Sequence, residues 1–300
     1  MKPLTTQVFY SRTIANLAHR APAVRPATSS SKDAPKDQEQ VEAFVPQEPR
    51  LPRSLELSSA PDVPGSFALA DSHTGAIVCR SPEQLRDRAN RFRRNGTTVI
   101  AVRHGESHSN KAGILSGSED TPLNEKGQNQ ARDAAKAILA TNDFQPQDLV
   151  IFTSPLSRAK DTALELQKLV PQAPLHLTPD LAEINFGQCE GLPISEVAAA
   201  YPNFASGHDF AHRFPQGESG LDVMGRIDRF LNQVENDFPD KTVVYFGHSM
   251  TVAMGRLLLG QLAVGDDGRV VFDKKTPNAI PEVLVKAEKP TEELGFLLAR

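Results

Sequence analysis

The sequence predicts an α/β protein of three layers, in which helices cover both faces of a mostly parallel β-sheet. Two observations lead to this fold class. Short apolar runs such as TTVIAV at 97–102 and TVVYFG at 242–247 are typical of buried strands. Between them lie longer segments whose apolar residues recur at helical spacing. Strands that alternate with helices in this way favour a parallel sheet covered by helices.

The first 64 residues predict a disordered tail and linker. Residues 21–64 contain eight prolines among many serine and charged residues. This segment has too few apolar groups to offset the entropy cost of ordering the chain. Residues 1–32 contain five Lys and Arg and no Asp or Glu. That composition fits an organelle transit peptide, a secretion leader or a plain tail. We expect a cytoplasmic protein, with organelle import or secretion as the alternative.

Residues 65–96 predict a short extension in front of the main domain. SFALADSHTGAIVCR at 66–80 has two apolar runs around a DSHTG turn, which predicts a hairpin. The basic segment at 81–96 predicts a helix, with Ser81 as N-cap, Pro82 in the first turn and Gly96 after its end.

Residues 97–300 are expected to form the main domain, and its elements follow in order. After the strand at 97–102, we expect a helix at 124–140 that begins behind Asn124 as N-cap. The further expected elements are a strand at 148–153, a helix at 155–170, an irregular stretch, a helix at 221–238, a strand at 242–247, a helix at 250–260 closed by Gly260, and an edge strand at 281–287.

Composition argues against several classes of function. A net charge of −4 gives no reason to expect a nucleic acid or an anionic membrane surface as partner. No apolar run approaches the roughly 18 residues of a membrane span. Cys79 and Cys189 form neither a disulfide framework nor a CxxC metal pattern, which fits a reducing compartment.

Three polar clusters stand at the expected carboxyl ends of strands, each just before a helix: RHGES at 103–107, SPLSR at 154–158 and GHS at 247–249. Ligands of open α/β sheets bind at this edge, where helix amino termini favour anions. Arginine forks match phosphate oxygens. Each cluster alone also fits a structural histidine, a helix cap or a packed turn. The three together, with two histidines and two arginines, predict a phosphate site.

These motifs, in this order, resemble the histidine phosphatase superfamily of phosphoglycerate-mutase-like proteins. The resemblance covers roughly residues 97–285 and includes RHGES with Asn110, DTPLNEKG, SPLSRAKDTA and GHS. The tracts LAEINFGQCEG, RFPQGES and TPNA are similar to the bisphosphatase domain of the bifunctional enzyme that handles fructose 2,6-bisphosphate. Broad-specificity sugar phosphatases share much of this pattern.

The resemblance implies a phosphomonoester hydrolase that works through a phosphohistidine. His104 would attack phosphorus while its other ring nitrogen donates to a backbone carbonyl, and Glu183 would protonate the leaving group, with Glu106 and Glu218 as the next candidates. The expected partner is a small phosphorylated metabolite, a sugar phosphate or bisphosphate, without cofactor or metal; the oligomeric state is not predicted. The implied site comprises catalytic His104, Glu183 and His248, phosphate-binding Arg103, Arg158 and Asn110, and substrate-binding Gly117, Tyr201, Arg213 and Ser249.

One position departs from the bisphosphatase pattern. RFPQGES carries Gln216 where those domains use a lysine for the second phosphate, which puts fructose 2,6-bisphosphate in doubt as substrate. Contacts from Lys111, Tyr201, His212 or Arg213 are the alternatives for this position.

Other functions fit the sequence less well than hydrolysis does. A phosphoglycerate-mutase-type phosphotransferase usually has a longer insertion between the acid and the second histidine than this chain has between Glu183 and His248. A non-catalytic phosphate-binding scaffold would be free to lose one of the site residues, whereas this chain has the complete set. GHSMT resembles the nucleophile elbow of α/β-hydrolases, but no histidine follows His248. A zinc site at His104 and His108 is opposed by the spacing, because HGESH does not match HExxH.

Overall fold

The computed structural model describes residues 67–70, 77–80, 82–141, 144–202, 212–262 and 276–288, all within one unit that spans residues 59–300. Its main sheet has five strands in the order β5-β4-β6-β3-β7. Four of them run parallel, and β7 joins one edge antiparallel to β3. Their bounds are β3 Thr98–Arg103, β4 Leu149–Thr153, β5 Leu175–Leu177, β6 Thr242–Gly247 and β7 Pro281–Val285.

The two faces of the sheet bury separate sets of apolar side chains, because successive residues of a strand point to opposite faces. Val243 and Tyr245 of β6 join one core cluster, and Val244 and Phe246 join the other. The strands β3 and β4 divide their apolar residues between the same two clusters. This burial on both faces explains the continuous apolar runs in the sequence.

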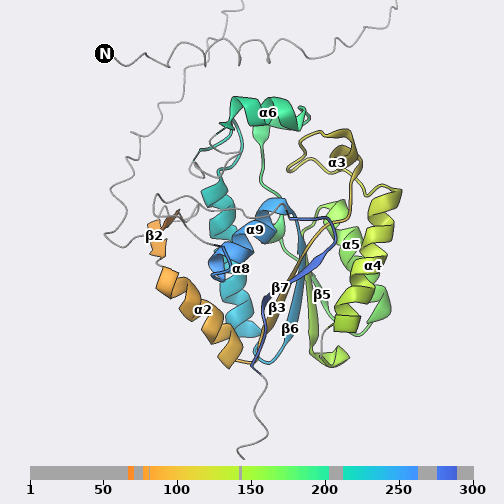
Figure 1. Ribbon diagram of the computed structural model, residues 1–300, viewed down its shortest axis with the longest axis vertical. Coiled ribbons are helices and arrows are strands. Elements are labelled where there is room, and N and C mark those ends of the chain that lie inside the picture. Colours follow the sequence, from red (N-terminus) through yellow and green to blue (C-terminus); the bar gives the residue numbers. More distant parts are fainter. Residues whose placement is uncertain are drawn as a thin grey trace, which may run out of the picture. The chain divides into compact units, whose positions relative to one another are not determined.

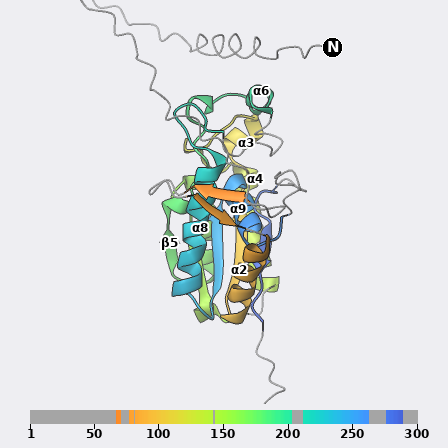
Figure 2. The ribbon, with the colours of Figure 1, turned by 90° about the vertical axis from the view of Figure 1, so that its left-hand side faces the viewer.

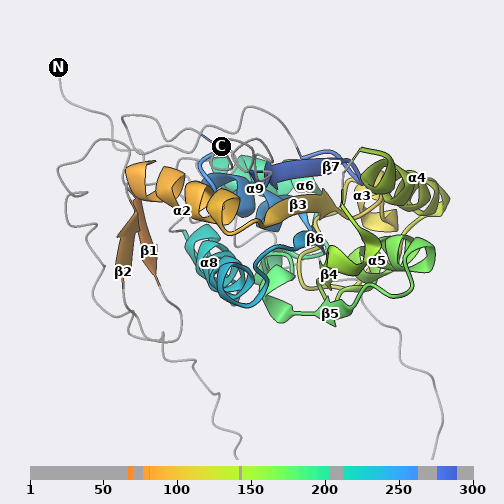
Figure 3. The same ribbon diagram turned by 90° about the horizontal axis from the view of Figure 1, so that it is seen from below.

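Helices cover both faces, which confirms the predicted three-layer fold (Figures 1 and 3). Residues of α4 and α5 pack into the core cluster of one face, and residues of α8 and α9 into that of the other. The side chain of Asn124 accepts a hydrogen bond from the backbone N–H of Gly127 and caps α4 as expected. The bounds are α4 Glu125–Thr141, α5 Ser157–Leu169, α8 Gly220–Asp237 and α9 Ser249–Leu258.

The hairpin and helix expected at 65–96 are present as β1 Phe67–Ala70, β2 Ile77–Arg80 and α2 Pro82–Arg94. The expected cap, Ser81, lies outside the described residues, whereas Gly96 follows α2 with a positive φ. Helix α2 lies beside α9 (Figure 2), and its Leu85, Ala89 and Phe92 are buried in the core cluster that α8 and α9 share. The extension is therefore joined to the main core by α2.

Several short elements in the described chain were not expected, and all of them lie outside the long periodic segments. They include the edge strand β5 and two short helices near the carboxyl edge of the sheet (Figure 1). Among the described residues, no helix has the length and apolar character to cross a membrane. The other short elements are the helices α3 His108–Ala112 and α6 Ile194–Ala200 and the 3₁₀ helices η2 Pro146–Asp148, η3 Pro179–Leu181 and η4 Gly187–Cys189.

Candidate active site

Strand register brings the three polar clusters of the sequence to one edge of the sheet. Arg103 at the end of β3 pairs with Gly247 at the end of β6. The ladder continues one residue further, where the backbone N–H of His104 donates to the Gly247 carbonyl at 3.0 Å. On the other side of β6, the N–H of Ser154 donates to the Phe246 carbonyl at 3.0 Å. His104, Ser154 and His248 thus follow three neighbouring strands.

The environment of His104 fixes which ring nitrogen carries the proton. Its Nδ1 lies 2.6 Å from the Gly105 carbonyl oxygen, which can only accept. Nδ1 therefore holds the hydrogen, and Nε2 keeps its lone pair, as the resemblance implies. The ring is 3% exposed, and burial, followed by the charges of Arg103 and Arg158, holds the pKa of His104 well below 6.5. A neutral imidazole results.

His248 lies beside His104, with the two ring centroids 5.1 Å apart. Its Nε2 is 2.9 Å from the Ser154 hydroxyl oxygen, which also accepts from the backbone N–H of Leu156. Its Nδ1 is buried and has no partner within the described part of the chain. Burial, followed by the nearby His104 ring and the charges of the two site arginines, holds the pKa of His248 well below 6.5.

Arg103 and Arg158 bring two positive charges to the histidine pair. Arg158 is 1% exposed and is aimed by the carbonyl oxygens of Gly117 and Glu119, at 2.7 and 2.9 Å. Arg103 donates to the Thr276 carbonyl at 2.8 Å, and its Nε has no partner among the described residues. Burial lowers the pKa of both guanidinium groups, and the carboxylate of Glu183 opposes this shift.

The carboxylate of Glu183 joins the same cluster through the first turn of α9. It accepts from the backbone N–H of Ser249 at 3.1 Å and of Met250 at 3.3 Å, and also from its neighbour Ile184 at 3.0 Å. Burial raises the pKa of Glu183 above 4.5, although these amides and the two arginines act in the opposite direction. The group therefore holds a proton to a higher pH than an ordinary glutamate does.

The RHGES turn is held from two sides. The Asn278 side chain donates to the His104 carbonyl at 2.8 Å and to the Asn110 side chain at 3.4 Å. Asn110 also accepts from the Ser107 N–H and so completes a capping box at α3. On the other side, Gly105 and Gly127 approach so closely that a Cβ on either would overlap backbone of the facing turn.

The four residues predicted to bind substrate lie at different depths. Gly117 presents its carbonyl to Arg158, and Ser249 presents its N–H to Glu183. Tyr201 packs against His212 and Phe214, and Arg213 pairs with Asp222 at 2.7 Å. None of the described contacts joins Tyr201 or Arg213 to the histidine cluster.

The two alternative acids are engaged elsewhere. The Glu106 carboxylate accepts from Lys126 at 2.7 Å and Asn124 at 2.8 Å, and these two bonds lower its pKa. Glu218 receives two hydrogen bonds from the Arg226 guanidinium. In the described part of the chain, no group of three or more His, Cys, Asp and Glu side chains is placed to hold a metal ion.

Sequence reasoning missed the residues that orient this cluster. The motif SPLSR does not indicate a partner for Ser154, and the tract TPNA does not indicate one for Asn278. Glu190 accepts from the backbone N–H groups of Ser118, Glu119 and Phe186 and so ties two irregular segments together. Apart from the Phe186 contact, which spans four residues, these contacts join residues remote in sequence, and a single chain carries no local signal for them.

Comparison with known proteins agrees with this geometry. An uncharacterized phosphatase, PhoE, of Bacillus subtilis is 31% identical over 170 residues, which cover 57% of this chain and 79% of the relative. Phosphoserine phosphatase 1 of Hydrogenobacter thermophilus is 33% identical over 166 residues, 54% of this chain and 76% of the relative. A 6-phosphofructo-2-kinase/fructose-2,6-bisphosphatase of Caenorhabditis elegans is 33% identical over 141 residues, 46% of this chain but only 29% of the relative.

The family model that matches the chain covers the whole cluster of site residues except Asn278. It describes the histidine phosphatase superfamily, branch 1, and matches residues 99–267, more than half of the chain. The chain therefore belongs to branch 1 of the histidine phosphatase superfamily and is an enzyme of the phosphatase class.

Proposed function

We propose that this protein hydrolyses small phosphomonoesters through a phosphohistidine formed on Nε2 of His104. The observation that carries the proposal is the 2.6 Å hydrogen bond between Nδ1 and the Gly105 carbonyl. It directs the lone pair of a neutral imidazole away from the backbone, and a nucleophile needs such a lone pair at neutral pH. The lowered pKa of His104 keeps this form populated.

The two arginines and His248 are proposed to hold the phosphoryl oxygens. Both guanidinium groups are positioned by backbone carbonyls before substrate arrives, so little reorganisation is needed as charge develops on the phosphoryl group. The unpartnered Nδ1 of His248 supports a contact with the same group. Asn110 is proposed as a neutral donor beside them, through the side-chain amide that its capping contacts leave available.

Glu183 is the proposed proton donor. In the first step Nε2 bonds to phosphorus, the bond from phosphorus to the ester oxygen breaks, and the Glu183 proton goes to that oxygen. In the second step water bonds to phosphorus, the bond to Nε2 breaks, and the Glu183 carboxylate takes up a proton from the water. Burial favours the protonated form that the first step requires. Glu106 and Glu218 fit less well, because each is engaged by a cationic side chain.

The proposed substrate is a small phosphorylated metabolite such as a sugar phosphate or bisphosphate. Two relatives carry names that include phosphoserine phosphatase and fructose-2,6-bisphosphatase, so both kinds of ester are reasonable test substrates. Gly117, Tyr201, Arg213 and Ser249 are the proposed substrate contacts. Arg213 already pairs with Asp222, so a second phosphate would have to compete with that carboxylate for it.

A comparison of leaving groups tests the acid. p-Nitrophenolate departs readily as an anion, whereas the alkoxide of glycerol 2-phosphate needs a proton. General acid catalysis typically contributes on the order of 10²- to 10⁴-fold. Glu183→Gln should therefore lower the single-turnover rate on glycerol 2-phosphate by about that factor and the rate on p-nitrophenyl phosphate much less.

The same measurement on Glu106→Gln is the matched control, because this carboxylate faces Lys126 rather than the histidines. Its two rates should fall together, if they fall at all. Equal losses on both substrates for Glu183→Gln would remove Glu183 from the acid role.

A further inference from the structure

Glu183 lies on a stretch of chain that contains no strand or α-helix. Between β5, which ends at Leu177, and α6, which begins at Ile194, the backbone forms only two short 3₁₀ helices. A side chain on such a segment has no ladder of backbone hydrogen bonds to fix its position. Proton transfer nevertheless requires the carboxyl group within hydrogen-bond reach of the leaving oxygen. The buried side chains of Leu181 and Ile184 anchor it in the core, and polar contacts from elsewhere in the chain hold its backbone.

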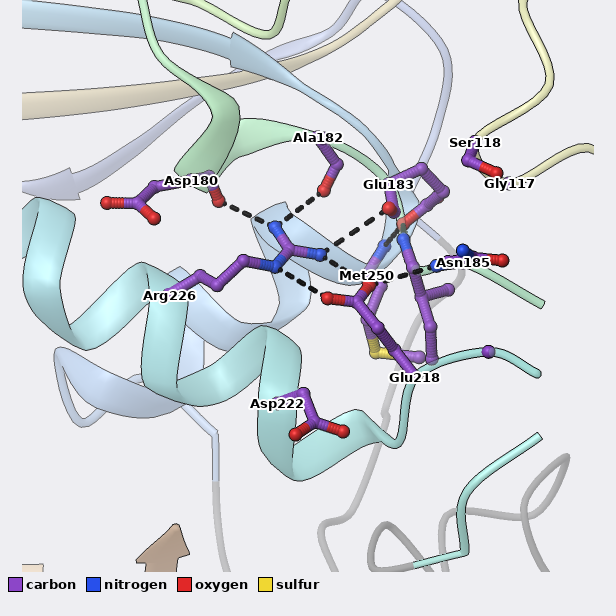
Figure 4. A network of polar contacts seen from close by, with 12 residues as sticks. Gly117, Ser118, Asp180, Ala182, Glu183, Asn185, Glu218, Asp222, Arg226 and Met250 are labelled. Atoms are coloured by element: carbon purple, nitrogen blue, oxygen red, sulfur yellow. Dashed lines mark hydrogen bonds and ion pairs between the residues drawn. The ribbon is translucent and has the colours of Figure 1, made fainter. Parts of the chain in front are cut away.

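Arg226 of α8 is the side chain that holds it (Figure 4). Its Nη1 donates to the backbone carbonyls of Asp180 and Ala182, at 2.8 and 2.9 Å. Its Nη2 adds a longer bond of 3.4 Å to the carbonyl of Glu183 itself. These contacts cover the residues that lead into Glu183. The Arg226 side chain is 12% exposed, so solvent competes little for its donors.

Glu218 contacts both Arg226 and the chain that follows Glu183. We call Arg226 and Glu218 together the clamp. It receives Nε and Nη2 of Arg226 on its two carboxylate oxygens, at 3.1 and 2.9 Å. The second oxygen also accepts from the backbone N–H of Asn185 at 3.0 Å, and the N–H of Glu218 donates to the Asn185 carbonyl at 2.7 Å. The two side chains thus bind the backbone before and after Glu183. All five N–H groups of the Arg226 guanidinium have an acceptor.

We propose that Arg226 and Glu218 are positioning residues, which hold the Glu183 carboxyl where it protonates the leaving oxygen. This inference rests on the proposed function, since it assumes that Glu183 is the proton donor. It assigns neither residue a contact with substrate. A displacement of about 1 Å in a reacting group can cost on the order of 10²-fold in rate, so the clamp should matter for esters that need the proton.

Arg226→Lys tests the clamp while it keeps the positive charge. An ammonium cannot supply the planar fork that reaches two carboxylate oxygens and three carbonyls. The single-turnover rate on glycerol 2-phosphate should fall about 10- to 100-fold, while p-nitrophenyl phosphate should lose less than about threefold. A loss of folded protein alone would lower both rates by the same factor, because the leaving group does not influence folding.

Arg88→Lys is the matched control. Arg88 is a buried arginine of α2 whose donors reach Asp228 and Asn232 of α8 rather than the Glu183 segment. Its substitution should leave the ratio of the two rates unchanged. If Arg226→Lys does not fold, Glu218→Gln replaces it, since the amide keeps one acceptor oxygen for Arg226 and loses the second. Its ratio should change in the same direction.

The double variant Glu183→Gln/Arg226→Lys separates this inference from the proposed function. If the clamp acts through Glu183, the double variant should show the same rate ratio as Glu183→Gln alone. A changed ratio for Glu183→Gln with an unchanged ratio for Arg226→Lys and Glu218→Gln would overturn the clamp and keep the acid. An unchanged ratio for Glu183→Gln would overturn both.

Discussion

At the scale of single residues, the two histidines are the groups whose protonation the fold constrains most. His104 and His248 are both buried, lie 5.1 Å apart and share the positive field of Arg103 and Arg158. Each of these conditions disfavours an imidazolium. The site therefore holds two neutral rings beside two cations, which fits the phosphate binding proposed for the arginines.

This arrangement predicts how stability depends on pH. Each histidine has a folded-state pKa below the ordinary 6.5, so the unfolded chain binds more protons once the pH falls below that value. Folding stability should then decrease with falling pH by at most about 1.4 kcal/mol per unit for each buried histidine. Urea unfolding at pH 7.5 and 5.5 measures this loss.

His104→Gln removes one of the two groups and should lose less stability over the same interval. His248 adds to this difference, because the His104 ring itself lowers the pKa of His248, and the remaining histidines are common to both proteins and cancel. An equal loss in the variant and the parent would mean that His104 takes up a proton as readily in the folded protein as in the unfolded one.

The sequence was informative about the residues that carry charge and chemistry, and less so about those that orient them. RHGES, SPLSR and GHS stood out because unusual side chains follow apolar runs. The roles of Ser154, Asn278 and Arg226 depend on partners up to 174 residues away, as for Asn278 and the His104 carbonyl. A serine hydroxyl, an asparagine amide and an arginine on a helix are common at such positions, so the sequence does not indicate their roles.

At the scale of elements, the long periodic segments, the 66–80 hairpin and the edge strand β7 were predicted, whereas β5 and the short helices were not. β4 and α5 were expected within two residues of their observed bounds, because apolar runs and helical stripes are strong signals. β5 has three residues and lies at the edge of the sheet, where Leu177 is exposed. Such a strand is fixed by pairing with β4 and has no burial pattern of its own.

Helix α2 shows how a segment in front of the main domain contributes to its core. Phe92 is fully buried against the cluster beneath α8 and α9, and Arg88 on the same helix pairs with Asp228. Phe92→Ala should lower the free energy of unfolding by about 3–5 kcal/mol, the usual cost of removing a buried aromatic ring. Denaturant midpoints measure it.

A second substitution on the same helix serves as the control. Arg86 is exposed, so Arg86→Ala should change the midpoint little. A small effect of Phe92→Ala would mean that α2 is only loosely associated with the core.

At the scale of the whole molecule, topology explains why the three polar clusters of the sequence meet at one edge of the sheet. Parallel strands end on the same edge of the sheet, and three of them deliver His104, Ser154 and His248 to neighbouring positions there. The fold class and this convergence followed from the alternation of strands and helices along the sequence. The segments that close over the edge, including α3 and α6, did not, because their short lengths and irregular connections follow from tertiary contacts.

The first 64 residues lie outside the described part of the chain, and their Pro- and Ser-rich composition predicts no contribution to the core. A chain that begins at residue 65 should therefore keep the kcat/KM and the unfolding midpoint of the full chain. Side-by-side assays of both proteins on p-nitrophenyl phosphate measure this. A large drop in kcat/KM with an unchanged midpoint would show that the segment acts at the site.

The most direct test of the central claim is to trap the phosphorylated enzyme. The protein is mixed with p-nitrophenyl phosphate in EDTA, quenched in alkali within the first turnover, and digested for mass spectrometry under alkaline conditions that preserve phosphohistidine. We predict one phosphoryl group per chain, on His104, formed at the rate of the p-nitrophenolate burst and without added metal. His104→Ala should show neither burst nor label and should keep the unfolding midpoint of a folded protein. Turnover by the parent protein without a label on His104, or near-normal activity of His104→Ala, would contradict the account.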